Sequence, residues 1–178
     1  MPRPKVEPAE TDMRMAQDLL FFAYRDFTNA ADVVLEELGL GRAHHRALHF
    51  IGRNPGIPVS DLLAILRVTK QSLARVLAAL IEQGYVAQAS GRADRRQRLL
   101  TLTAAGSALE RKLFDRQRAR LVPAWRQAGP DAVAGFRCVM RAISSPSTRA
   151  SDCLVMRRMP SRSDTMIPGL RPMKCSAR

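Results

Sequence analysis

The chain has 178 residues, 46 % of them hydrophobic, which is enough for one packed domain with an extension. Its 29 Lys and Arg outnumber 16 Asp and Glu, giving a net charge of +13 and a pI of about 11.2. This positive net charge favours a polyanionic partner, either nucleic acid or an acidic membrane surface. The sequence contains no apolar run of about 18 residues, so no transmembrane helix is predicted.

The N-terminal segment, residues 1–11, contains three prolines and is expected to be disordered. It lacks the apolar core of a secretory signal. The three cysteines are odd in number and have no metal-ligand spacing, so we expect reduced thiols in a cytoplasmic protein that does not enter a membrane.

Residues 12–40 are predicted to form a long helix that is apolar on two sides. One stripe at helical spacing comprises Ala16, Leu19, Leu20, Ala23, Phe27, Ala30, Val34 and Leu38. Phe21, Phe22 and Tyr24 add a second apolar face. Because a surface helix buries one stripe, the second face favours contact with another subunit and predicts a homodimer. The alternative is a helix buried deep inside a monomer.

A shorter helix is predicted over residues 42–53, before the turn signal Asn54-Pro55-Gly56. It contains His44, His45 and His49, and the last two are spaced so that both could face one metal ion. No third ligand follows from the spacing. We therefore interpret the histidines as interface residues and predict no metal site, with a metal-dependent protein as the weaker alternative.

Residues 58–84 have the pattern of a helix-turn-helix. A short apolar helix over 58–66 is followed by a turn, and then by a second helix with Thr69 as its N-cap, where a hydroxyl accepts from a first-turn amide. Gly84 ends that helix, since glycine tolerates left-handed geometry. Its apolar stripe comprises Leu73, Val76, Leu77, Leu80 and Ile81.

The other face of the second helix is polar at its N-terminal end, where Lys70, Gln71 and Arg75 can hydrogen-bond base edges in a major groove. Two strands over 85–89 and 97–102, joined by a polar loop, predict a wing. Residues 67 to 98 include seven basic and two acidic side chains, so positive charge is concentrated on this helix and wing. The alternative is an ordinary amphipathic helix followed by an exposed hairpin.

Two helices are predicted after the wing. The first is capped by Thr103, extends to about residue 126 and should be kinked by Pro123. Gly129-Pro130 interrupts it, and an apolar helix follows over 131–143. We expect Cys138 to be buried in that second helix and therefore unreactive.

Residues 144–178 have no sustained periodicity, are rich in Ser, Arg and Pro, and are expected to form a basic disordered tail. No phosphate-binding loop, nucleophile elbow, HExxH or dinucleotide-binding glycine pattern occurs in the chain, and the carboxylates are scattered singly. We therefore predict that the protein is not an enzyme and uses no cofactor.

The stretches VTKQSLARVLAALIEQGYV and SGRADRRQRLLTLTAAG resemble the MarR family of bacterial transcription regulators, and GRAHHRALHFI is similar to its PetP-type branch. The resemblance covers about residues 12–143. It implies a mainly α fold with a small β wing: a winged helix-turn-helix over 42–103 and dimerisation helices over 12–40 and 104–143. Two features differ from many members, which have Gly in place of Arg67 and a further helix after residue 144.

The resemblance also implies which residues contact DNA. Those at or near the major groove are Thr69, Lys70, Gln71, Ser72 and Arg75. In the wing, Asp94 should brace Arg96, which enters the minor groove, with Arg92 and Arg95 beside it. We therefore predict a homodimer that binds an inverted repeat in double-stranded DNA and, on family grounds, acts as a repressor.

Many family members bind a small phenolic or aromatic acid between the dimerisation helices and the winged helix. A corresponding pocket in this chain would be bounded by Phe22, His44, His45 and Trp125. Other members use a reactive cysteine in the N-terminal helix, which this chain lacks. The alternative to a sequence-specific regulator is a nonspecific nucleic-acid-binding or architectural protein driven by its basic charge.

Overall fold

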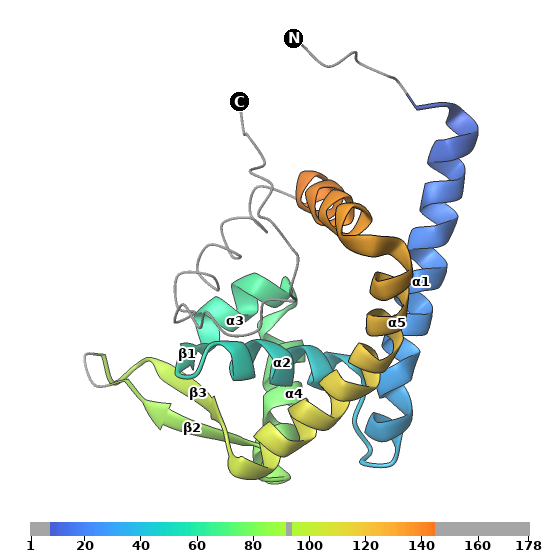
Figure 1. Ribbon diagram of the computed structural model, residues 1–178. Coiled ribbons are helices and arrows are strands. Elements are labelled where there is room, and N and C mark those ends of the chain that lie inside the picture. The colour runs from blue at the N-terminus through green and yellow to red at the C-terminus, as the bar shows by residue number, and fades with distance from the viewer. Residues whose placement is uncertain (1–7, 92–93, 145–178) are drawn as a thin grey trace.

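The computed structural model describes residues 8–91 and 94–144, and the mainly α fold with a small β wing is confirmed. In chain order the elements are α1 (Glu10–Glu36), α2 (Arg42–Arg53), β1 (Ile57–Pro58), α3 (Val59–Leu66), α4 (Lys70–Glu82), β2 (Val86–Ser90), β3 (Arg98–Leu102) and α5 (Ala104–Ile143). Figure 1 shows the β2–β3 hairpin projecting from one side of the helices, with α1 on the opposite side. The expected disorder of residues 1–7 and 145–178 lies outside the described residues.

The first helix begins at Glu10, two residues earlier than the sequence analysis placed it. Glu10 and Asp12 lie in the first turn of α1, where negative side chains interact favourably with the positive end of the helix dipole. Glu10 also forms an ion pair with Arg14 one turn later, at 2.6 Å. These local interactions extend the helix into the segment that was expected to be disordered.

The sheet contains one more strand than the predicted two-stranded wing. Its order is β1-β3-β2, all antiparallel, and Ile57 pairs with Leu100 while Val86 pairs with Leu102. The prediction that a helix begins at Pro58 is therefore wrong by one residue. Pro58 has extended backbone angles, φ −63° and ψ 145°, and serves as the N-cap position of α3.

The core lies where α2, α3, α4 and the sheet meet the first half of α5. Fully buried side chains from these elements include Leu48, Ile51, Leu62, Leu73, Leu80, Leu100 and Leu113. On α4, Leu73, Leu77 and Leu80 are buried, whereas Ile81 is 38 % exposed. Burying one leucine side chain contributes about 1.5–3 kcal/mol, so this stripe fixes which face of α4 is left to solvent.

The longest helix, α5, runs beside α1 (Figure 1). Its non-helical backbone angles are at Gly129, where φ is 80°, directly before Pro130. The interruption expected at Gly129-Pro130 is therefore confirmed, whereas at Pro123, where a kink was also expected, the backbone angles stay helical. Glycine adopts left-handed geometry without a steric penalty, and the following proline cannot donate a helical hydrogen bond.

The segment of α5 after Gly129 leaves apolar side chains in solvent. Phe136, Val139 and Ile143 are 53, 59 and 62 % exposed. Cys138 is exposed as well, so the prediction that it lies in a buried helix is wrong for the single chain. The apolar pattern was interpreted correctly as a packing face, but the described part of one chain does not cover that face.

One short segment joins the wing to α5 and to the end of α4. The Thr103 hydroxyl donates to the Gly84 carbonyl oxygen at 2.7 Å and accepts from the Gly106 amide at 3.0 Å, so it caps α5 as predicted. The Thr103 amide donates to the Tyr85 carbonyl oxygen at 3.0 Å. A Cβ atom at position 106 would lie 1.9 Å from that same oxygen, so only glycine fits there.

We predict that Gly106→Ala destabilises the protein, because the atom it would displace belongs to the backbone at the start of the wing. The expected loss of unfolding free energy is about 1–3 kcal/mol, the range for overpacked sites. Ser107→Ala is the matched control on the same helix, since Ser107 is exposed and lies one residue from Gly106. That variant should keep the wild-type stability to within about 0.5 kcal/mol. Urea denaturation measures both, and equal stability of the two variants would contradict the packing argument.

Candidate nucleic-acid interface

The first turn of α4 is closed by two hydroxyl groups. The Thr69 hydroxyl oxygen accepts from the Ser72 amide at 3.2 Å, which confirms Thr69 as the N-cap. The same hydroxyl donates to the Ser72 side-chain oxygen at 2.9 Å. Lys70, Gln71 and Arg75 are exposed on this turn and the next. The cap therefore orders the backbone that carries these three side chains.

The turn between α3 and α4 is made by a residue with left-handed geometry. Arg67 has φ 52° and ψ 43°, and its amide donates to the Leu63 carbonyl oxygen at 2.9 Å. Such a conformation costs a residue with a Cβ atom roughly 1–2 kcal/mol, which glycine avoids. The turn thus has the geometry that favours glycine even though this chain has arginine there.

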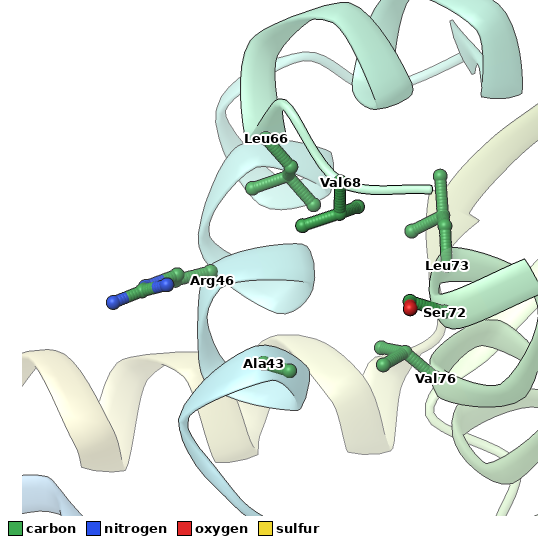
Figure 2. A pocket seen from close by; sticks show the side chains of 7 residues that line it. All are labelled: Ala43, Arg46, Leu66, Val68, Ser72, Leu73 and Val76. Atoms are coloured by element: carbon green, nitrogen blue, oxygen red, sulfur yellow. The ribbon is translucent and has the colours of Figure 1, made fainter. Parts of the chain in front are cut away.

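The turn and α4 pack against α2. A void of roughly 50 Å³ lies beside α2. Figure 2 shows side chains around it from the end of α3, the turn and α4, including Leu66, Val68 and Val76. Arg46 of α2 extends away from this void. On this side α4 is held mainly by apolar contacts of Leu73 and Val76, with Ser72 beside them.

The tip of the wing is closed by hydrogen bonds around Asp94. Its carboxylate accepts from the Arg96 amide at 2.9 Å, and its carbonyl oxygen accepts from the Gln97 amide at 3.0 Å. The Gly91 amide donates to the Gln97 carbonyl oxygen at 2.9 Å, and a Cβ at position 91 would lie 2.7 Å from the Asp94 carbonyl oxygen. Glycine at position 91 therefore permits the closure.

Asp94 contacts Arg96 through the backbone. The contact is with the Arg96 backbone, and no ion pair between the two side chains occurs among the described residues. A short aspartate side chain readily reaches the amide two residues further on. Arg95 and Arg96 are exposed beside this turn, and Arg92 lies outside the described residues.

A separate hollow of roughly 200 Å³ lies between α1, α2 and α5. Of the four side chains expected at a ligand pocket, His45 lines it, together with Tyr24, Phe27, His49 and Gln117. The other three have different neighbours. His44 accepts from the Gly41 amide at 3.0 Å and closes the start of α2, while Phe22 packs against Phe21 and Trp125 packs against Arg137.

Two arginines of α2 that the sequence analysis did not select connect this hollow to α1. Arg46 donates to the Tyr24 hydroxyl at 2.6 Å, and Arg42 donates to Asp32 at 2.8 Å and to Asn29 at 2.7 Å. Their i, i+4 spacing is the signal that places both on one face of α2. Both side chains also line the hollow.

The surroundings of His45 on α2 lower its pKa. Burial lowers the pKa of His45, and the nearby His49 lowers it further. Glu110 acts in the opposite direction, and its carboxylate lies 3.6 Å from Nδ1 of His49. His45 is therefore neutral near pH 7, able to donate one hydrogen bond and accept another.

Within the described residues, no three potential metal ligands come together, and no helix there has the length and apolar character to cross a bilayer.

A helix-turn-helix followed by a basic β hairpin defines the class of winged-helix DNA-binding proteins. A family model described as MarR family matches residues 38–97. The HTH-type transcriptional regulator PetP from Rhodobacter capsulatus is 50 % identical over 140 residues, which cover 79 % of this chain and 84 % of that protein. The chain therefore belongs to the MarR family of transcriptional regulators, which bind DNA and are not enzymes.

Solved structures share the fold at lower identity. Streptococcus pneumoniae FabT in complex with DNA is 18 % identical with a TM-score of 0.65, and the match covers 74 % of this chain and 94 % of that one. NadR in complex with 4-hydroxyphenylacetate is 19 % identical with a TM-score of 0.57, covering 80 % and 97 %.

We predict that Asp94→Asn and Asp94→Ala affect DNA binding in opposite directions. Asparagine keeps an acceptor for the Arg96 amide and removes a negative charge near phosphate, so affinity should rise. Alanine removes the charge and also the acceptor, so the tip loses its order and affinity should fall below that of the wild type. Binding to one duplex across a salt series measures both. If Asp94→Ala binds as tightly as Asp94→Asn at every salt concentration, the Asp94–Arg96 contact has no role in binding.

Proposed function

We propose that the chain is a homodimeric transcriptional repressor that binds an inverted repeat. The observation that carries the dimer is the exposed apolar surface of α1. Phe21 and Leu19 are 63 and 62 % exposed, and Phe22 and Leu20 are 49 and 48 % exposed. The end of α5 adds the exposed Phe136, Val139 and Ile143 described above. Exposed large apolar side chains of this number are typical of a protein–protein interface and cost free energy when left in water.

In each subunit we place α4 in a major groove and the wing in the adjacent minor groove. Gln71 and Arg75 are exposed one turn apart on α4, where a Gln–adenine and an Arg–guanine pair are the bidentate contacts that geometry favours. Thr69 and Ser72 lie at the cap, near the backbone that approaches the groove. Arg96, flanked by Arg92 and Arg95, suits the narrow minor groove, whose negative potential attracts arginine.

Repression is the simplest consequence of such binding, because a dimer seated on a promoter excludes other proteins from it. The membership of the MarR family supports regulation of transcription, and FabT with DNA supports contact through this fold. The competing function is nonspecific binding through the net charge of +13, which gives affinity without a preferred sequence.

We also propose that the hollow between α1, α2 and α5 binds a small aromatic acid that relieves DNA binding. Phe27 and Phe50 supply apolar contacts, and Arg42, Arg46 and neutral His45 supply donors for a carboxylate or phenol. The complex of NadR with 4-hydroxyphenylacetate lends support to this class of ligand. Calorimetric titration with 4-hydroxyphenylacetate and with salicylate tests it, and the absence of heat with either acid at millimolar concentration would count against this class.

Two measurements test the DNA-binding proposal together. Light scattering at micromolar concentration should give the mass of a dimer, and selection from randomised DNA should return an inverted repeat with half-sites about 10 bp apart. The double variant Phe21→Asp, Phe22→Asp on α1 should be a monomer. Arg116→Asp, which changes an exposed residue on α5, should remain a dimer. A monomer for the wild type, with affinity independent of sequence, would favour the nonspecific alternative.

A further inference from the structure

A third hollow, of roughly 510 Å³, lies between α3, α4 and the strands of the wing. Its floor includes Leu63, Leu73 and Leu77, and its rim includes Lys70 from α4 and Arg98 from β3. We propose that this hollow receives the sugar–phosphate backbone of DNA, with Lys70 and Arg98 holding one phosphodiester group between them. The inference rests on the proposed placement of α4 and the wing, and it assigns a role to Arg98 that the sequence analysis did not.

The positive charge of Lys70 and Arg98 favours binding of an anion in this hollow. Lys70 and Arg98 are both exposed, and neither takes part in an ion pair among the described residues. The side chains lining the hollow include no carboxylate. Two cations from separate elements, with no acidic neighbour in the lining, produce a local positive field that attracts an anion.

The shape of DNA is the second argument. A helix in the major groove and a wing in the neighbouring minor groove are separated by one sugar–phosphate chain, which must pass between them. The hollow occupies that position in the protein, since α4 forms one side and β2 and β3 contribute Gln88 and Arg98 to the other. The apolar floor excludes water beneath the phosphate and strengthens its interaction with both cations.

The rigidity of the rim is the third argument. Arg98 is the first residue of β3 and pairs with Ser90 across the hairpin, so the strand holds its backbone in register. Lys70 begins α4 directly after the Thr69 cap. Both backbones are therefore ordered before DNA arrives, which lowers the entropy lost when their side chains bind one group.

This arrangement changes the role of Lys70 from base contact to phosphate contact. Phosphate contacts position a protein on the duplex but carry no direct sequence information. The proposal therefore separates the polar residues of α4 into two sets: Gln71 and Arg75 contact base edges, and Lys70 acts with Arg98 on the backbone.

The test uses the full chain, a duplex carrying its selected site and a scrambled duplex, each titrated across a salt series. Arg98→Gln and Lys70→Gln should each weaken binding to the two duplexes by the same factor. Because both cations neutralise one phosphate, the double variant Lys70→Gln, Arg98→Gln should reduce the log–log salt slope by about 0.9, and each single variant by less. Arg98→Lys should restore most of the slope, which excludes misfolding as the cause. Arg116→Gln on α5 is the matched control and should leave affinity and slope unchanged.

A single methylphosphonate, which removes one phosphate charge, locates the contact. At one position in each half-site, the methylphosphonate should weaken DNA binding by the wild type. It should not further weaken DNA binding by the double variant Lys70→Gln, Arg98→Gln. If the wild type binds its selected site but the double variant Lys70→Gln, Arg98→Gln keeps the same slope, the inference is wrong while the proposed function stands. If Arg98→Gln changes the preferred sequence, the residue contacts a base and the inference is also wrong. Benzoate tests whether the hollow binds a small carboxylate instead. That alternative holds if benzoate raises the melting temperature of the wild type but not of Arg98→Gln, while Arg98→Gln leaves the salt slope of DNA binding unchanged.

Discussion

The Thr103 hydroxyl joins the end of α4, the wing and α5, and the relative orientation of α4 and the wing depends on this junction. It accepts from the first turn of α5 and donates to the Gly84 carbonyl just after α4. The Gly106 backbone approaches the Tyr85 carbonyl so closely that no side chain fits between them. Because α5 also runs along α1, this junction sets how the proposed dimer interface is oriented relative to the proposed DNA surface.

The second connection is α2, which contacts α1, α3, α4, α5 and the sheet. Ala43 of α2 packs on the turn before α4, and Arg42 and Arg46 of the same helix bond to α1. A molecule bound in the hollow near His45 would therefore touch the same helix that supports α4. Such a ligand changes DNA binding only if it prefers one orientation of α2 over another, since equal affinity for both shifts nothing.

The elements that sequence analysis predicted well are those specified by local chemistry. The Thr69 cap, the stripe from Leu73 to Leu80, the stop at Gly84 and the Thr103 cap each depend on neighbouring residues along the chain. The two-residue strand β1 was missed because it is too short for any periodicity and forms only by pairing with β3. The exposure of Cys138 and the lining of the hollow near His45 were missed because both depend on tertiary packing.

In the candidate site too, local features were predicted from the sequence and tertiary contacts were not. The residue types of the wing indicated a role for Asp94 beside Arg96, but only the geometry distinguishes a backbone contact from a side-chain contact. Likewise, the sequence placed Lys70 with Gln71 and Arg75 on one polar face, whereas the structure places it on the rim of a hollow with Arg98. Neighbours across the fold cannot be read from spacing along one helix.

Methylation interference on the selected duplex tests the central claim most directly, because it probes both grooves in one experiment. Methylating N7 of one guanine in each half-site, in the major groove, should block binding of the wild type but not of Arg75→Ala. Methylating adenine N3 in the flanking minor grooves should also block binding, and that effect should disappear in Arg96→Ala. The two guanines should lie about 10 bp apart. Interference in only one half-site, or none at any guanine N7, would contradict a dimer that places α4 in successive major grooves.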